Sequence, residues 1–288
     1  MRKIFASLVF TCASASAACA FVLSNFETPE SFVVDPADGS YYVSNVNGDP
    51  AAKDGNGYIS KIQSNGDITI QKFIGGKKDE PLLNSPKGLV IVGQIIYVTD
   101  IDAVKGFYKE TGKPAAVFDL SKFKARFLND VTADDKGYLY VSDTVTNQIF
   151  KINTHREHEV TIYSEGKELG APNGLLINPK SKNLVVVTSN SGRVLEIDRA
   201  RKIHVLKRGL VGLDGVDYDG RGNLYASSFE KGEIYKIPHM GRGALETFMS
   251  GLTTPADISC DRNKKELLIP SFTGNKVMTV SLDQKKIT

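Results

Sequence analysis

The stretch "NDVTADDKGYLYVSD" (residues 129–143) contains two short apolar-rich runs on either side of a turn made of aspartate, lysine and glycine. Runs of this kind, separated by turn residues, predict a β-hairpin. "QIFKIN" (148–153) and "EVTIYS" (159–164) follow closely and predict two further strands. Together these segments predict a unit of four short antiparallel strands.

Phrases of the same form recur through the chain, and the start of each marks one unit. The six starts are Glu30, Lys87, Asn129, Asn173, Asp214 and Ala256. They are separated by 57, 42, 44, 41 and 42 residues, and such a period is typical of the four-stranded blades of a β-propeller. The sequence therefore predicts an all-β, six-bladed β-propeller. The first interval is longer because "NVNGDPAAKDGNG" (45–57) is inserted, and we expect an exposed loop there.

The sixth unit shows only three strands, the last of them in "KVMTVSL" (276–282). "FVLSNF" (21–26) is a strand-like segment that belongs to no unit. Pairing of this segment with the sixth unit would close the ring and leave no long open edge. We therefore expect one propeller domain over residues 21–288.

Residues 1–20 have the form of a signal peptide. Arg2 and Lys3 precede a short apolar run, and "ACA" provides a small-residue cleavage site. The run is too short to span a bilayer, so we expect export to the periplasm or secretion, and no transmembrane segment. Lipidation of Cys19 is an alternative, although Ser16 stands where a lipobox prefers leucine.

The composition is that of a soluble globular protein. Of the 288 residues 41% are hydrophobic, and the formal net charge is +3, which is not the basic footprint of a nucleic-acid binder. Cys260 is the only cysteine after the predicted cleavage site, and we expect a buried structural thiol. The four histidines are scattered, which gives little support to a zinc site.

The six starts are expected to converge, because the first strand of each propeller blade lines the central channel. Four of them carry carboxylate or amide oxygens, the hard ligands that suit Ca²⁺, Mg²⁺ or Mn²⁺. These four are Glu30, Asn129, Asn173 and Asp214. The alternative is that these side chains only accept hydrogen bonds from backbone amides around the channel. Lys87 also enters this ring, where it would attract an anionic substrate or pair with Glu30.

The chain resembles the gluconolactonase, senescence-marker-protein and luciferin-regenerating-enzyme family of six-bladed propellers over essentially all of residues 21–288. The resemblance lies in a glutamate in the first unit, an asparagine in a "PNG" phrase and an aspartate in a "DG" phrase. It implies that Glu30, Asn173 and Asp214 bind one divalent cation. It also implies that Asn129 is a fourth ligand or a substrate contact. Calcium is the first expected ion, with Mg²⁺, Mn²⁺ and Zn²⁺ as alternatives.

Two features of the chain differ from the family pattern. Arg126, in "ARFLND", resembles a substrate-contacting arginine of some members, but its offset differs. The family often continues its glutamate with Gly-Pro and then a tryptophan, whereas Ser31 and Phe32 follow here and the chain has no tryptophan. For both Arg126 and Lys87, a solvated or ion-paired residue is the alternative interpretation.

A cation in the channel would polarise the carbonyl of a lactone or ester, and Asp214 would then take the proton of a bound water as general base. This chemistry predicts a metal-dependent hydrolase of small cyclic esters, a gluconolactonase-like lactonase with a small-molecule substrate such as a sugar lactone. A non-catalytic propeller of the NHL-repeat type, which binds a protein or a cell-envelope ligand, is the first alternative. An enzyme of the related strictosidine-synthase-like group is the second. Asp100, Asp102 and Asp143 end second strands, and we expect them to brace turns.

Overall fold

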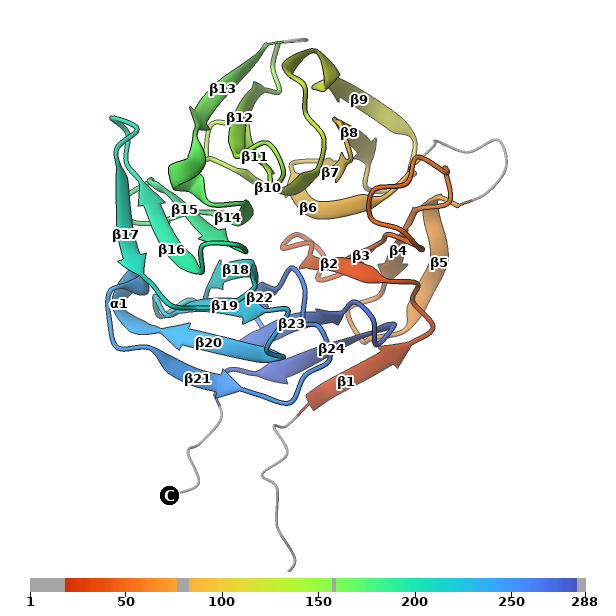
Figure 1. The fold of residues 1–288 in the computed structure, drawn as a ribbon. Helices are drawn as coiled ribbons and strands as arrows, with labels where there is room; N and C mark the ends of the chain where they lie inside the picture. Colours follow the sequence, from red (N-terminus) through yellow and green to blue (C-terminus); the bar gives the residue numbers. More distant parts are fainter. Residues whose placement is uncertain (1–18, 77–82, 157–158, 284–288) are drawn as a thin grey trace, which may run out of the picture.

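The protein is described by a computed structural model covering residues 19–76, 83–156 and 159–283. Six four-stranded antiparallel sheets form a ring around a central channel (Figure 1). This arrangement confirms the predicted six-bladed β-propeller. The helical segments among the described residues are only short turns, namely η1 (Ser121–Phe123), η2 (Lys167–Leu169) and α1 (Pro238–Gly241).

The first five blades are each made of four consecutive strands, β2–β5, β6–β9, β10–β13, β14–β17 and β18–β21. The strands in chain order are β1 (Cys19–Ser24), β2 (Pro29–Val34), β3 (Tyr41–Asn45), β4 (Tyr58–Ile62), β5 (Ile68–Gly75), β6 (Pro86–Val92), β7 (Ile95–Asp100), β8 (Ala103–Tyr108), β9 (Pro114–Asp119), β10 (Leu128–Ala133), β11 (Tyr138–Asp143), β12 (Gln148–Asn153), β13 (Val160–Glu165), β14 (Pro172–Ile177), β15 (Leu184–Thr188), β16 (Arg193–Ile197), β17 (Ile203–Lys207), β18 (Leu213–Tyr218), β19 (Leu224–Ser228), β20 (Glu233–Ile237), β21 (Glu246–Met249), β22 (Ser259–Asp261), β23 (Glu266–Ser271) and β24 (Lys276–Ser281).

The turns between strands use glycine where the backbone requires it. Gly137 and Gly222, in the turns "DDKG" and "DGRG", have φ values of 80° and 83°. Residues with a Cβ rarely adopt this region, so glycine permits the tight connections between β10 and β11 and between β18 and β19. Both segments are hairpin turns.

The sixth blade is closed by the start of the chain. Its strand order is β1-β24-β23-β22, and Val22, Leu23 and Ser24 pair with Met278, Val277 and Lys276. Figure 1 shows β1 alongside β24, which confirms the predicted closure.

The predicted signal peptide lies largely outside the described residues, which begin at Cys19. Cleavage after Ala20 would remove two residues from β1. The pairings of Val22, Leu23 and Ser24 with β24 would remain.

The hydrophobic core is divided among the interfaces between neighbouring blades, and each of the six interfaces has its own cluster. In the cluster between blades 2 and 3, for example, Val104 and Phe118 pack with Val141 and Phe150. Cys260 lies in the cluster between blades 5 and 6, where burial raises the pKa of its thiol. The free thiol is therefore buried, as predicted.

The insertion at residues 45–57 connects β3 to β4 and is exposed only in part. Its exposed residues are Gly48, Asp49, Ala51, Lys53 and Asp54, whereas both of its ends are buried. One part of it reaches the channel. The Pro50 carbonyl accepts a hydrogen bond from Lys87 Nζ at 2.8 Å, and Pro50 lines the central cavity. An ion pair between Lys53 Nζ and Asp102 Oδ2 (2.5 Å) ties the loop to blade 2.

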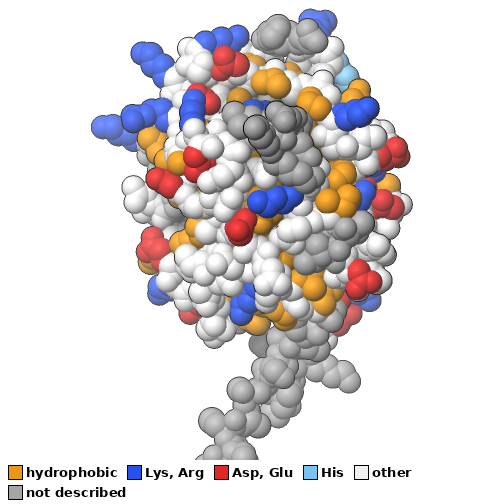
Figure 2. Space-filling model, turned by 90° about the vertical axis from the view of Figure 1, so that its right-hand side faces the viewer, with side chains coloured by type: hydrophobic (Ala, Val, Ile, Leu, Met, Phe, Trp, Pro, Cys, Tyr) orange, Lys and Arg blue, Asp and Glu red, His pale blue; other side chains and the backbone are white. Residues whose placement is uncertain are grey.

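The surface shows mixed charges. On the face in Figure 2, acidic and basic side chains are interspersed with small apolar areas. Within the described part of the chain, no helix has the length and apolar character needed to cross a membrane.

Candidate functional site

The residues at the six starts (Glu30, Lys87, Asn129, Asn173, Asp214 and Ala256), here called the inner ring, lie where the backbone pairing is interrupted. In the first blade Pro29 pairs with Asn45 and Phe32 pairs with Val43, so that the register shifts around Glu30. The same shift occurs at the start of the next four blades. A β-bulge re-aims the side chain that it contains. The recurring bulge therefore directs the inner-ring side chains into the channel.

In blades 3 and 5 a serine hydroxyl on the second strand links the bulge to the next blade. In blade 3 the Asp130 amide donates to Ser142 Oγ (3.0 Å), and Ser142 Oγ donates to the Asn173 carbonyl of blade 4 (2.8 Å). The corresponding pair of bonds recurs in blade 5 around Ser227. These hydroxyls satisfy the backbone groups that the bulges leave unpaired, and they fix inner-ring positions of adjacent blades relative to each other.

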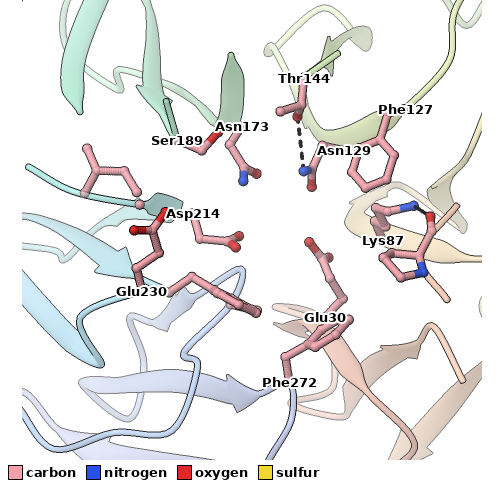
Figure 3. A pocket seen from close by; sticks show the side chains of 15 residues that line it. Glu30, Lys87, Phe127, Asn129, Thr144, Asn173, Ser189, Asp214, Glu230 and Phe272 are labelled. Atoms are coloured by element: carbon pink, nitrogen blue, oxygen red, sulfur yellow. Dashed lines mark hydrogen bonds between the residues drawn. The ribbon is translucent and has the colours of Figure 1, made fainter. Parts of the chain in front are cut away.

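The inner ring surrounds a cavity of about 270 Å³ in the central channel (Figure 3). The residues that line it are Glu30, Pro50, Lys87, Phe127, Asn129, Thr144, Asn173, Ser189, Gly212, Leu213, Asp214, Phe229, Glu230, Ala256 and Phe272. Every predicted site residue is among them except Arg126. The Arg126 side chain is exposed, and only its backbone N–H takes part in the turn, donating to Asp143 Oδ2 at 2.7 Å.

Three inner-ring oxygens are buried without a hydrogen-bond partner. They are Glu30 Oε2, Asn129 Oδ1 and Asp214 Oδ1, and the described residues contain only one other such side-chain atom, Asn56 Oδ1. Asn129 Nδ2 donates to Thr144 Oγ1 (3.2 Å), which fixes the orientation of the amide. Burying an unpaired polar atom is costly, so three such oxygens in one cavity are expected to have a ligand.

Two other buried carboxylates near the channel, those of Asp130 and Asp257, accept hydrogen bonds from the protein. The two carboxylate oxygens of Asp130 accept from the amides of Val131 and Leu175, each at 2.6 Å. Asp257 Oδ2 accepts from Ser31 Oγ at 2.5 Å. Bracing of backbone and hydroxyl donors therefore explains these side chains, but it does not account for the three unpaired oxygens of the inner ring.

Two of the aspartates that end second strands brace turns, as predicted. Asp143 accepts from the amides of Arg126 and Thr146 at 2.7 and 3.0 Å. Asp100 accepts from the Ser85 amide at 2.7 Å. The expectation for Asp102 was wrong, because β7 ends at Asp100 and Asp102 lies beyond it. Asp102 forms the ion pair with Lys53 described above.

The inner ring gathers carboxyl groups in a buried environment. Burial raises the pKa of Asp214 to about 8, and the charge of Asp257 adds to this shift. Burial also raises the pKa of Glu30 well above its usual value, with Asp214 and Asp257 adding to the shift and Lys87 opposing it. Burial raises the pKa of Asp257 to about 7. A bound cation would reverse these shifts by favouring the carboxylate forms.

The donor set fits a hard divalent cation. Among the described residues, no three histidine, cysteine, aspartate or glutamate side chains gather as a metal-binding group. A cation here would therefore be held by the two carboxylates of Glu30 and Asp214 together with the amide oxygens of Asn129 and Asn173. Oxygen-only ligands of this kind are those of Ca²⁺ and Mg²⁺ sites.

Lys87 lines the cavity, but its ammonium group is already engaged. Its Nζ donates to the Pro50 carbonyl (2.8 Å) and to the carbonyl and hydroxyl oxygens of Ser85 (3.2 and 3.1 Å). An ammonium group has three hydrogens, so these bonds use all of them. Its Nζ also lies 4.4 Å from the centroid of the Phe127 ring, and burial lowers its pKa to about 8 against the opposing charge of Glu30. Lys87 therefore holds the inserted loop against the channel wall.

A second set of cavity residues was not identified from the sequence. In blades 3, 4, 5 and 6 the residue that follows the second strand is Thr144, Ser189, Phe229 and Phe272, respectively. These four residues, here called the outer ring, all line the cavity. Each donates its backbone N–H, at 2.8–3.2 Å, to the carbonyl two residues before the inner-ring residue of its blade. In the sequence, these residues directly follow the second-strand phrases "YVSD", "VVVT", "LYASS" and "LLIPS", so an alignment of the six units at that position would identify them.

The raised carboxyl pKa values predict how stability depends on pH when metal is absent. Between about pH 4 and 7 the folded protein holds protons on Asp214 and Asp257 that the unfolded chain has lost. The free energy of unfolding should therefore fall as pH rises through this window. We expect it to be lower at pH 7.5 than at pH 5.5 by at least about 1 kcal/mol, because one pKa unit is worth about 1.4 kcal/mol. Urea unfolding with a chelator at both pH values measures this.

The variant Asp214→Asn provides the control for this pH dependence. It removes one of the titrating groups, so the difference between the two pH values should shrink. Stability that stays level or increases from pH 5.5 to 7.5 in the metal-free wild type would contradict the prediction.

No protein-family model and no curated protein matches the chain. Solved structures match it. Virginiamycin B lyase from Staphylococcus aureus is 15% identical with a TM-score of 0.62, covering 92% of this chain and 89% of that one. A nidogen–laminin complex is 21% identical with a TM-score of 0.63, covering 77% and 80%. A Bacteroides thetaiotaomicron protein of unknown function is 15% identical with a TM-score of 0.69, covering 93% and 74%.

These identities show a shared fold and nothing finer. The chain is thus a six-bladed β-propeller with a buried, oxygen-rich inner ring in its channel. The more specific resemblance to the gluconolactonase family stays a prediction.

Proposed function

We propose that this protein is a metal-dependent hydrolase of small cyclic esters, with a divalent cation held in the central channel. One observation carries the proposal, namely the three buried inner-ring oxygens that have no hydrogen-bond partner. Glu30, Asn173 and Asp214 are the proposed ligands. Asn129 is a fourth ligand through Oδ1 or a substrate contact. Calcium fits this oxygen set best, with Mg²⁺, Mn²⁺ and Zn²⁺ as alternatives.

The charges of the inner ring support this assignment. Glu30 and Asp214 are no more than 9% exposed, and together they would neutralise a divalent ion. Without the ion, burial raises the pKa values of both carboxyls. Cation binding at pH 7 should therefore release protons, since the ligands must be deprotonated.

The chemistry follows from these groups. When bound, the cation supplies polarisation of an ester carbonyl and a more acidic water. Asp214 is the proposed proton acceptor, and it later returns the proton to the departing oxygen. The net reaction breaks the acyl C–O bond of the ring and consumes one water. It leaves a carboxylic acid at one end of the product and a hydroxyl at the other.

Metal binding by the purified protein tests the proposal. After removal of metal with a chelator, calorimetric titration with Ca²⁺, Mg²⁺, Mn²⁺ or Zn²⁺ should show one ion per chain for at least one of these metals. Proton release should appear as a dependence of the measured heat on the ionisation enthalpy of the buffer. Glu30→Gln should weaken binding by at least about 10-fold, because it removes one of the two negative charges that face the ion. The exposed Glu110→Gln is the matched control and should bind as the wild type does.

Two outcomes would redirect the assignment. Absence of stoichiometric binding for all four metals would contradict the metal site. If the wild type also hydrolyses no lactone or aryl ester, a non-catalytic propeller that binds a protein or cell-envelope ligand becomes the better description. Residues 1–20 predict export for either function, and we propose that the protein acts in the periplasm or outside the cell.

A further inference from the structure

The cavity wall around the inner ring is mainly apolar and aromatic. Phe127, Leu213, Phe229 and Phe272 all line it. The rings of Phe229 and Phe272 meet edge to face with centroids 5.7 Å apart. Figure 3 shows the rings of Phe127 and Phe272 bordering the same opening as the Glu30 and Asp214 carboxylates. A substrate whose ester reaches the inner ring would therefore place its remaining atoms against phenylalanine.

Three polar side chains of the same wall, those of Thr144, Ser189 and Lys87, already donate their hydrogen bonds to the protein. Thr144 Oγ1 donates to the Pro172 carbonyl at 2.8 Å, and Ser189 Oγ donates to the Ala171 carbonyl at 3.3 Å. The three hydrogens of Lys87 Nζ are bonded to Pro50 and Ser85, as described above. The wall therefore presents few free donors for the hydroxyl groups of a sugar ring.

These two properties favour one class of substrate over another. Outside the inner ring, the wall offers the hydroxyls of a polyhydroxylated lactone one carboxylate acceptor, Glu230, and few free donors. Most of these hydroxyls would therefore lose water without regaining equivalent hydrogen bonds, which opposes binding. An aromatic group would instead contact phenylalanine rings in the edge-to-face or offset geometry that aromatic pairs prefer. The cavity volume of about 270 Å³ lies just below the usual range for drug-sized ligands, so it suits a small molecule with a single ring substituent.

We propose that the substrate is a small lactone or ester that carries an aromatic group, and not a sugar lactone. This inference rests on the proposed function. The ester occupies the inner ring, and the aromatic group lies against Phe229 and Phe272. These two phenylalanines determine specificity. They take no part in proton transfer.

A matched series of five-membered lactones tests the substrate class. The series is γ-butyrolactone, γ-phenyl-γ-butyrolactone and D-ribono-1,4-lactone, which share the reacting ring and differ in what it carries. We expect kcat/KM, divided by the rate constant of uncatalysed hydrolysis, to be at least about 10-fold higher for the phenyl compound than for each of the others. The protein is used with saturating metal.

Three variants locate the effect. Phe229→Ala and Phe272→Ala should each lower kcat/KM for the phenyl lactone by at least about 10-fold, mainly through KM, and change γ-butyrolactone by less than about 3-fold. Phe229→Leu keeps the apolar volume, so it separates loss of the ring from loss of packing. Phe248→Ala is the control. Phe248 is half-buried on β21, in the same blade as Phe229, and its replacement should leave the phenyl preference unchanged.

Binding of 5-phenylpyrrolidin-2-one, a lactam that is not readily hydrolysed, separates this inference from the proposed function. Turnover without a phenyl preference, or a preference that survives Phe229→Ala and Phe272→Ala, overturns the aromatic substrate class and leaves the hydrolase in place. Lactam binding that depends on both phenylalanines, with no turnover of any lactone, overturns the hydrolase and supports the aromatic site. Absence of both turnover and lactam binding overturns both.

Discussion

Replacing Asp214 with asparagine is expected to lower the turnover of a lactone or ester by about 100-fold or more, the scale of losing a general base. It is also expected to weaken binding of the divalent cation. The substitution keeps the size of the side chain and one oxygen, but it removes a negative charge and the proton acceptor. Asp214 Oδ1 is buried with no partner, so no protein group compensates for the loss. Steady-state kinetics over a range of metal concentrations separates the two effects.

Two further variants make this result specific. Glu30→Gln should mainly weaken metal binding, so that excess metal restores part of its turnover. Asp135→Asn removes an exposed carboxylate 3.2 Å from Lys182 and should leave turnover unchanged, because exposed ion pairs contribute little. Equal turnover by the wild type and Asp214→Asn at saturating metal would remove Asp214 from the role of general base.

The fold could be predicted because each blade is built from local hairpins. A repeat read at one phase therefore locates every first strand, and the missing strand of the sixth unit identifies residues 21–26 as its partner. The β-bulges at the blade starts could not be predicted. They depend on the pairing of residues such as Pro29 and Asn45, which the residue pattern alone leaves undetermined.

The inner ring could be predicted for the same reason, since equivalent positions of a propeller converge at its axis. Three features of the site could not be predicted from the sequence. Arg126 precedes the first strand of its blade, and its side chain is exposed. Lys87 is engaged by Pro50, a loop residue 37 positions away, which no repeat phase relates to it. The outer ring, which includes Phe229 and Phe272, follows the second strand in blades 3 to 6, and its residue types vary from threonine and serine to phenylalanine, so no shared residue type marks it in the sequence.

The glycines that follow the inner ring have a role that the sequence did not reveal. The "NG" and "DG" pairs have the form of turn dipeptides, but Gly174 and Gly215 lie within strands β14 and β18. A Cβ on Gly174 would lie 2.4 Å from the Asp214 carbonyl oxygen of the next blade, and one on Gly215 would lie 2.3 Å from the Ile258 nitrogen. Neighbouring blades therefore approach each other beside the site more closely than any residue with a side chain would allow.

Gly215→Ala is expected to destabilise the protein by at least about 3 kcal/mol or to prevent folding, at the severe end of overpacking effects. The three atoms nearest to the added methyl group would be backbone atoms of Asp257 and Ile258, at 2.3–2.8 Å, so movement of a flexible side chain cannot relieve the overlap. Gly220→Ala in the same blade is the matched control, because its Cβ would meet nothing within 4 Å. It should change stability by less than about 0.5 kcal/mol. Urea unfolding followed by circular dichroism, together with the soluble yield, measures both variants, and equal stability of the two would show that the blades can separate to admit the methyl group.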